Sequence, residues 1–167
     1  MELGATVCIP NGAPKCDVCP VRPLCLGYRR GTADLLPMKA AKKARKIEEK
    51  TVFLFLRDGK VALRKRKSDG LLAGLWEFPN VSGMLEEDLA PISVAGWDLA
   101  PKSWKKKLAA KHIFTHVEWH MTGYLLEVSG EGPEEFFWMD ISELAEHAVP
   151  AAFAKYYAEA KAQLEEK

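Results

Sequence analysis

Thr51-Val52-Phe53-Leu54-Phe55-Leu56-Arg57-Asp58-Gly59-Lys60-Val61-Ala62-Leu63-Arg64-Lys65-Arg66 is the stretch of sequence that decides the fold. Residues 51–57 form an apolar run rich in aromatic and branched side chains, which is typical of a buried strand. Asp58-Gly59 is a strong signal for a two-residue turn, and residues 60–66 return with Val61 and Leu63 on one face. These features predict a β-hairpin at the start of a globular unit.

The sequence after this hairpin contains further strand-like and helix-like patterns. Apolar residues at helical spacing distinguish the helices, and short apolar runs bounded by glycine or proline indicate the strands. Together they predict an α+β fold with a mixed β-sheet. The expected elements are a glycine-rich crossing into a short strand at 70–79, a short helix or basic connector at 103–110, a long hairpin at 111–128 broken near Thr122-Gly123, a strand at 136–139, and helices at 141–148 and 151–166.

Length and composition limit the class of protein. The chain has 167 residues, a formal net charge of +1 and 48% hydrophobic residues, which suffices for one good core and a small additional lobe. No apolar run reaches the roughly 18 residues that a membrane helix needs. Residues 1–5 do not begin a basic region followed by an apolar run, so nothing indicates export. We therefore expect a soluble, cytoplasmic protein.

All four cysteines, Cys8, Cys16, Cys19 and Cys25, lie within one short segment. Four soft thiolates at short, unequal spacings suit an iron–sulfur cluster or a structural zinc ion. Two disulfides are the alternative, but they belong mainly to small exported proteins. A zinc ribbon usually has two Cys-x2-Cys pairs, whereas this chain has one, and zinc remains an open alternative to iron.

The first third of the chain is basic, while acidic residues gather toward the C-terminus. Such a charge distribution is typical of a segment that meets nucleic acid, although residues 39–50 alone fit a solvated linker equally well. Basic residues within the cysteine segment favour phosphate contacts. The candidates for contacts with the DNA backbone are Lys15, Arg22, Arg29 and Arg30, and the basic run continues with Lys39, Lys42, Lys43, Arg45 and Lys46.

Composition divides the chain into three parts. Residues 1–30 contain the cysteine loop, residues 31–50 form a Lys/Ala-rich basic linker that Pro37 interrupts, and residues 51–167 form the globular unit.

The order of elements in the globular unit, with Gly74-Leu75-Trp76-Glu77-Phe78-Pro79 after the hairpin, resembles a Nudix fold. The resemblance implies a rival function, hydrolysis of nucleoside diphosphate derivatives with Mg²⁺ held by glutamates on one helix face. The catalytic pattern G-x5-E-x7-R-E-U-x-E-E-x-G-U, where U is aliphatic, is absent after Pro79. Glu86, Glu87 and Asp88 are adjacent and would spread around a helix, so we interpret them as a solvated acidic turn.

The cysteine spacing C-x7-C-x2-C-x5-C is similar to the C-x6-C-x2-C-x5-C iron–sulfur loop of the endonuclease III and adenine DNA glycosylase superfamily. That resemblance implies a 4Fe-4S cluster held by Cys8, Cys16, Cys19 and Cys25. A four-cysteine loop, a basic linker and a Nudix-like domain without its catalytic pattern together resemble the C-terminal half of the A/G-specific adenine DNA glycosylases, the MutY family. This resemblance covers nearly the whole chain.

The segment His112-Ile113-Phe114-Thr115-His116-Val117-Glu118-Trp119-His120 resembles the Phe-Ser/Thr-His loop with which that family reads 8-oxoguanine. The resemblance implies that Phe114 wedges at the lesion, Thr115 offers its hydroxyl to the base edge and His116 supports the contact. A hydroxyl suits this task because oxidation turns guanine N7 into a donor and adds an acceptor at O8.

The pattern alone also fits an ordinary strand with Ile113, Thr115 and Val117 on one side and histidines on the other. The spacing of the histidines permits a zinc site, although strand periodicity accounts for it without a metal.

The family resemblance implies recognition rather than catalysis. The helix-hairpin-helix, the adenine pocket and the acidic catalytic residues of that family lie upstream of its cysteine loop and are absent from this sequence, so we expect no adenine excision by this chain alone. The implied partners are duplex DNA with 8-oxoguanine opposite adenine and a separately supplied catalytic domain, with this chain a monomer. A free-standing Nudix hydrolase and a zinc-ribbon interaction module are the alternatives.

Overall fold

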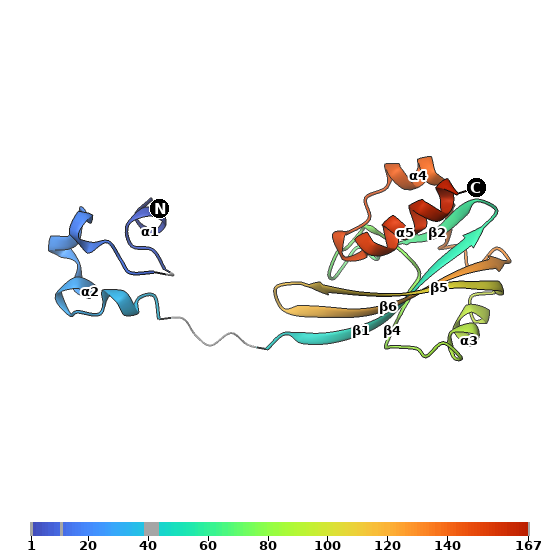
Figure 1. The fold of residues 1–167 in the computed structure, drawn as a ribbon, viewed down its shortest axis with the longest axis horizontal. Coiled ribbons are helices and arrows are strands. Elements are labelled where there is room, and N and C mark those ends of the chain that lie inside the picture. Colours follow the sequence, from blue (N-terminus) through green and yellow to red (C-terminus); the bar gives the residue numbers. More distant parts are fainter. Residues whose placement is uncertain (1, 11, 39–43, 167) are drawn as a thin grey trace. The chain divides into compact units, whose positions relative to one another are not determined.

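A computed structural model describes residues 2–10, 12–38 and 44–166. The chain divides into two compact units, residues 1–43 and 44–167 (Figure 1), which are described separately. Three of the basic residues predicted to face DNA, Lys39, Lys42 and Lys43, lie outside the described residues. In the described part of the chain, no helix is both long and apolar enough to cross a membrane.

Residues 2–10 and 12–38 of the first unit contain five short helical turns. Proline lies in the first turn of the second 3-10 helix, where its missing N–H costs nothing. None of the unit's described residues is buried, so it has no apolar core of its own. The elements are α1 (Glu2–Thr6), η1 (Cys16–Val18), η2 (Arg22–Leu24), α2 (Leu26–Arg29) and η3 (Ala33–Leu35).

The second unit is a mixed sheet with the order β3-β2-β1-β6-β5, in which β4 also pairs with β1 and β7 with β2. The central pair β1 and β6 is parallel, and the other pairs are antiparallel. The strands are β1 (Lys46–Arg57), β2 (Lys60–Lys65), β3 (Trp76–Glu77), β4 (Asn80–Ser82), β5 (Ala100–Ile113), β6 (Val117–Ser129) and β7 (Phe137–Met139); the helices are α3 (Ala90–Ala95), α4 (Ile141–Glu146), η4 (Ala151–Phe153) and α5 (Ala154–Glu165).

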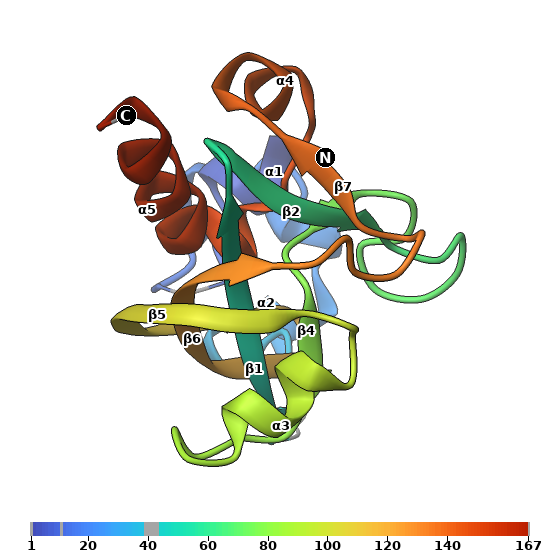
Figure 2. The same ribbon diagram turned by 90° about the vertical axis from the view of Figure 1, so that its right-hand side faces the viewer.

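Helices cover both faces of this sheet (Figures 1 and 2), with α5 and α4 on one face and α3 on the other. The central strand β1 supplies both cores because its side chains alternate: Val52 and Leu54 pack in the cluster that contains Tyr156 of α5, while Phe53 and Phe55 pack in the cluster under α3. This fold confirms the predicted Nudix-like mixed sheet with flanking helices.

The predicted hairpin is present, and the two helix predictions near the C-terminus match α4 and the helical segment η4–α5. The turn between β1 and β2 consists of Asp58 and Gly59, with φ values of 49° and 75°. Positive φ at both positions is what a hairpin turn that follows the strand twist requires, and Asp-Gly is the sequence that tolerates it best.

Two predictions in the middle of the unit are wrong. Residues 103–110 are strand, within β5, and the hairpin turns at residues 114–116 rather than near Thr122-Gly123. Two irregularities in the β5–β6 register, between Pro101 and Ser103 and between Trp104 and Lys106, shift the alternation that would have revealed a strand. Gly123 does not mark a turn: a Cβ atom there would overlap the Tyr156 ring, so glycine permits close packing of α5 on the sheet.

The predicted linker, residues 31–50, overlaps structured elements at both ends. Residues 33–35 form η3 in the first unit, and residues 46–50 are the first part of β1. Polar and charged side chains give this part of β1 the composition of a linker. It is strand because each residue from Lys46 to Lys50 lies opposite a residue of β6, so the sheet begins five residues before the apolar run.

Candidate functional site

The segment predicted to read the lesion is the loop between β5 and β6. The Phe114 N–H donates a hydrogen bond to the Val117 carbonyl, 2.8 Å away, and closes a tight turn. Thr115 and His116 occupy the tip of that turn and are exposed. The structure therefore places a hydroxyl and an imidazole side by side at the end of a long hairpin, where a macromolecular surface can reach them.

The first residue of β1 and the residue before it make hydrogen bonds to this loop. The Lys46 N–H donates to the His116 carbonyl at 3.1 Å, and Arg45 Nε donates to the Phe114 carbonyl at 3.2 Å. The Lys46 bond follows from the parallel pairing of β1 with β6, which sets Lys46 opposite Val117, whereas the Arg45 bond is made by its side chain. Carbonyls on both sides of Thr115 are thus fixed by two consecutive residues.

Phe114 is half-buried and packed against other rings. Its ring makes edge contacts with His112, at 4.6 Å between centroids, and with Trp119, at 4.9 Å. Trp119 is 1% exposed, and its indole N–H donates to Glu48 at 3.1 Å. An insertion of Phe114 between bases would have to break these ring contacts, so its predicted role as a wedge stays a prediction. Ile113, which is 52% exposed, is the outward-facing apolar residue next to the turn.

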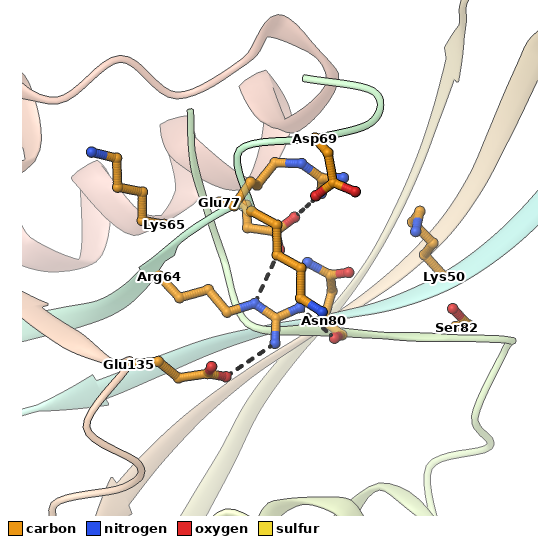
Figure 3. A pocket seen from close by; sticks show the side chains of 10 residues that line it. Lys50, Arg64, Lys65, Asp69, Glu77, Asn80, Ser82 and Glu135 are labelled. Atoms are coloured by element: carbon orange, nitrogen blue, oxygen red, sulfur yellow. Dashed lines mark hydrogen bonds and ion pairs between the residues drawn. The ribbon is translucent and has the colours of Figure 1, made fainter. Parts of the chain in front are cut away.

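Trp119 also contacts two residues that line a basic cavity, Lys50 and Arg66. The Lys50 ammonium lies 4.7 Å from the Trp119 ring centroid, and the Arg66 guanidinium lies 5.7 Å away. The cavity has a volume of about 410 Å³ and is shown in Figure 3. Its lining consists of five basic, three acidic and two neutral polar residues: Lys50, Arg64, Lys65, Arg66, Lys67, Asp69, Glu77, Asn80, Ser82 and Glu135.

Glu77 is the buried carboxylate of this cavity, with a side chain that is 5% exposed. Arg64 Nε donates to it at 3.0 Å, and Arg66 pairs with its other oxygen (Figure 3). Arg64 also donates to the Asn80 carbonyl at 3.0 Å. Because two guanidiniums engage its two oxygens, Glu77 serves as the internal counter-ion of the basic cluster. The sequence pattern that could have indicated this basic cluster is the Arg-Lys-Arg-Lys run at 64–67, followed by one glutamate, Glu77, in an apolar segment.

The charge in this cavity affects Lys50. Burial lowers the pKa of Lys50, and the carboxylates of Glu48 and Glu77 offset this only in part, while Arg66 and Arg64 add to the lowering.

The acidic residues predicted to form a solvated turn, Glu86, Glu87 and Asp88, are exposed before α3 and do not line the cavity.

The four cysteines surround one small cavity in the first unit. No disulfide joins Cys8, Cys16, Cys19 and Cys25 in this structure, and all four line this cavity together with Arg22 and Tyr28. Desolvation raises the pKa of Cys16, and the charges of Cys19, Cys25 and Cys8 act in the same direction. The Tyr28 N–H donates to Cys25 Sγ at 3.4 Å. Within residues 2–10, 12–38 and 44–166, no three histidine, cysteine or acidic side chains are grouped in the manner of a site for a single metal ion.

The residues predicted to contact the DNA backbone differ in how free they are. Arg22 pairs with Asp17 at 3.3 Å and lies 4.4 Å from the Tyr28 ring centroid, and Arg29 donates to the Pro23 carbonyl at 2.8 Å. Lys15 and Arg30 are exposed. Arg22 therefore contributes to the unit's own structure, whereas the exposed cations are better placed to meet phosphate.

The fold and the residues at its site define the class. A model of the NUDIX domain matches residues 51–159, and the chain belongs to the NUDIX domain family. Over most of its length the chain is similar to curated adenine DNA glycosylases. It is 26% identical to the one from Rattus norvegicus over 94% of this chain and 41% of that protein, and 28% identical to the one from Schizosaccharomyces pombe over 86% and 42%. The chain thus spans about two fifths of the length of these relatives.

Solved structures support the same fold. The C-terminal domain of mouse MUTYH, in a complex with human PCNA, aligns with 71% of this chain and 87% of that domain, at 22% identity and a TM-score of 0.51. The E. coli ORF135 protein aligns with 72% of this chain and 92% of that protein, at 18% identity and a TM-score of 0.54. The similarity to adenine DNA glycosylases confirms the family resemblance inferred from the sequence.

Proposed function

We propose that this chain is the lesion-recognition part of a base-excision-repair adenine DNA glycosylase and that it recognises 8-oxoguanine opposite adenine in duplex DNA. The observation that carries the proposal is the β5–β6 turn, which presents Thr115 and His116 at an exposed tip fixed by hydrogen bonds. Similarity to adenine DNA glycosylases over 94% of the chain supports it. The proposed role of this chain is recognition rather than adenine excision.

The chemistry of the turn suits the lesion. The Thr115 hydroxyl both donates and accepts, so it can pair with either the N7–H donor or the O8 acceptor that distinguish 8-oxoguanine from guanine. His116 adds a second exposed polar group beside it. Lys15, Arg22, Arg29 and Arg30 are proposed as phosphate contacts, which add affinity without lesion selectivity.

The cofactor proposed for the first unit is a 4Fe-4S cluster held by Cys8, Cys16, Cys19 and Cys25. Four cysteines around one cavity, with a Cys16 pKa raised by desolvation and by the charges of the other three, fit a group whose positive charge would stabilise the thiolates. When bound, such a cluster would supply cross-links among four points of a unit that buries no described residue. Metal analysis of protein purified without oxygen decides between about four iron atoms per chain and zinc.

A nucleotide pyrophosphohydrolase is the second candidate, because the basic cavity beside Glu77 would suit the phosphates of a nucleotide. Glu77 is already paired with Arg64 and Arg66, which argues against its use as a Mg²⁺ ligand. Hydrolysis of oxidised nucleoside triphosphates in the presence of Mg²⁺ or Mn²⁺, and its loss in Glu77→Gln, would support this candidate over recognition alone.

The proposed function is tested by competition binding at fixed salt. Duplex with 8-oxoguanine opposite adenine is compared with the matched guanine:adenine duplex, with the full chain purified without oxygen. A clear preference for the lesion duplex is expected. Equal and salt-sensitive binding to both duplexes would show that the chain alone does not recognise the lesion.

A further inference from the structure

Arg45, which precedes β1, and Lys46, the first residue of β1, contact the β5–β6 turn in a way that sequence alone did not suggest. Arg45 Nε and the Lys46 N–H donate to the carbonyls of Phe114 and His116, respectively. These carbonyls belong to the residues on either side of Thr115. The turn's remaining hydrogen bond, from the Phe114 N–H to the Val117 carbonyl, closes it but does not fix the tip to the rest of the sheet.

We propose that Arg45 is a positioning residue that sets lesion selectivity by holding the Phe114 carbonyl, and thereby the backbone on either side of Thr115, in the reading geometry. The inference rests on the proposed function. It assigns to a residue of the predicted linker a role in selectivity rather than in phosphate contact.

Thr115 can read a base edge only if the backbone that carries it is held in place. A hydroxyl that reads a base edge must stay within a few tenths of an ångström of its partner, and a two-residue tip between long strands bends easily unless its peptide groups are held. The Lys46 bond is part of the β1–β6 ladder and is available with any side chain at position 46. The Arg45 bond is made by a side chain, so Arg45 is the residue of the pair whose identity matters.

A phosphate contact is the competing role for Arg45. Its neighbour Lys46 provides a matched control, because the Lys46 side chain pairs with Glu48 at 3.0 Å while its backbone N–H makes the contact with the loop. Lys46→Ala therefore removes a positive charge next to Arg45 and leaves both loop hydrogen bonds in place. Arg45→Ala removes a similar charge and one of the two bonds.

Binding to both duplexes at two salt concentrations separates these roles. Arg45→Ala is expected to reduce the ratio of affinities for lesion and guanine duplexes by roughly three- to tenfold, as expected for the loss of one hydrogen bond. Lys46→Ala should keep the wild-type ratio, and Arg45→Lys, which retains a donor, should restore part of it. Equal weakening of both duplexes by Arg45→Ala, with a flatter salt dependence, would identify a phosphate contact and overturn the proposal.

Amide hydrogen exchange tests the clamp without DNA. In Arg45→Ala the Phe114 and Lys46 amides should exchange several times faster than in the wild type, because the loop opens more often. The Phe136 amide, which donates to the Pro133 carbonyl in a different turn, should be unchanged. Unchanged exchange at Phe114 would refute the clamp. Faster exchange in a protein whose wild type does not prefer the lesion would instead retain the clamp and reject the proposed function.

Discussion

At the scale of single residues, Thr115 at the tip of the β5–β6 turn is the residue on which the proposed function depends most directly. Its hydroxyl is the group that the proposed function needs, and its exposed position means that removal disturbs no packing. Thr115→Ala should lower the preference for the lesion duplex by about 1 kcal/mol, or roughly fivefold, while affinity for the guanine duplex changes little. Fluorescence anisotropy with both duplexes measures this. Equal losses on the two duplexes would remove Thr115 from the role of reader.

Glu77 is the residue on which the basic cavity depends. In Glu77→Ala the guanidiniums of Arg64 and Arg66 lose their shared counter-ion, and the protein should lose about 1–3 kcal/mol of stability. The loss stays below that for a fully buried pair because the two arginine side chains are 22% and 19% exposed. Chemical denaturation measures the free energy of unfolding of the second unit.

Glu135 offers the matched control for this experiment. It pairs with Arg64 at 3.5 Å, but its side chain is 60% exposed, so Glu135→Ala should cost less than about 0.5 kcal/mol. Similar losses for the two variants would mean that burial of Glu77 does not strengthen its interactions.

Local sequence patterns indicated the turn residues of the candidate site, but not the residues that contact that turn or line the basic cavity. Phe114, Thr115 and His116 were identified from the sequence because they are consecutive and match a family loop. Arg45 lies 69 positions from Phe114 in sequence, and no local pattern indicates that the two meet. The basic cavity was not predicted either, since its side chains come from β1, β2, β3 and β4 and from the segments that connect β2 with β3 and β6 with β7.

At the scale of elements, helix α4 shows how one side chain fixes an end. The Asp140 carboxylate accepts hydrogen bonds from the backbone N–H groups of Glu143 and Ser142, each at 2.9 Å. In return, the Asp140 N–H donates a hydrogen bond to the Glu143 carboxylate. This reciprocal arrangement is a capping box. The backbone N–H of Glu143, followed by the Ser142 hydroxyl, holds the pKa of Asp140 below its ordinary value.

A depressed carboxyl pKa has a definite consequence for pH. The stabilisation by Asp140 is fully present above the ordinary value of 3.8 and is lost as the pH falls through the lower folded-state pKa. Asp140→Ala should therefore lower Tm at neutral pH, and the difference from the wild type should shrink in acid. Thermal unfolding from pH 7 down to pH 3 measures both. Asp140→Asn, which keeps the acceptor but cannot titrate, should retain most of the stability, and a difference that grows in acid would contradict the capping role.

Elements with one clear period were predictable from sequence, and those with interrupted periods were not. The β1–β2 hairpin has a clean apolar run and an Asp-Gly turn, and α5 has apolar residues at helical spacing. In β5, four lysines between residues 102 and 107 and two register shifts hide the strand, because its edge position lets charged side chains face solvent. Pairing with β6, which no local window contains, makes it a strand.

At the scale of the whole molecule, the two units differ in what stabilises them. The second unit has two apolar cores, whereas no described residue of the first unit is buried. A unit of this size without a core needs cross-links, and its four cysteines are the groups that can provide them. Composition predicts three parts, residues 1–30, 31–50 and 51–167, but the lack of buried residues in the described part of the first unit became evident only from the structure.

Removal of the proposed cluster should therefore act on the first unit alone. Chelation of protein purified without oxygen should make residues 1–38 sensitive to protease and leave Tm of the second unit within about 1 °C, since the cores do not involve the cysteines. Limited proteolysis with mass spectrometry and scanning calorimetry measure the two effects. Cys19→Ser provides the control, because it should reproduce the protease sensitivity without chelator. Protection of residues 1–38 in the metal-free protein would contradict this dependence.

The parallel pairing of β1 with β6 has a consequence for synthesis on the ribosome. Lys46 lies opposite Val117, so one edge of the central strand has no partner until 71 more residues have emerged. During that interval the apolar run from Val52 to Leu56 could pair with another nascent chain, because an unpaired apolar strand edge promotes aggregation. The charged residues that precede it in β1, including Lys46, Glu48, Glu49 and Lys50, are placed where gatekeeper residues oppose such association. Residues 46–50, which have the composition of a linker, would thus oppose aggregation of the chain before its synthesis is complete.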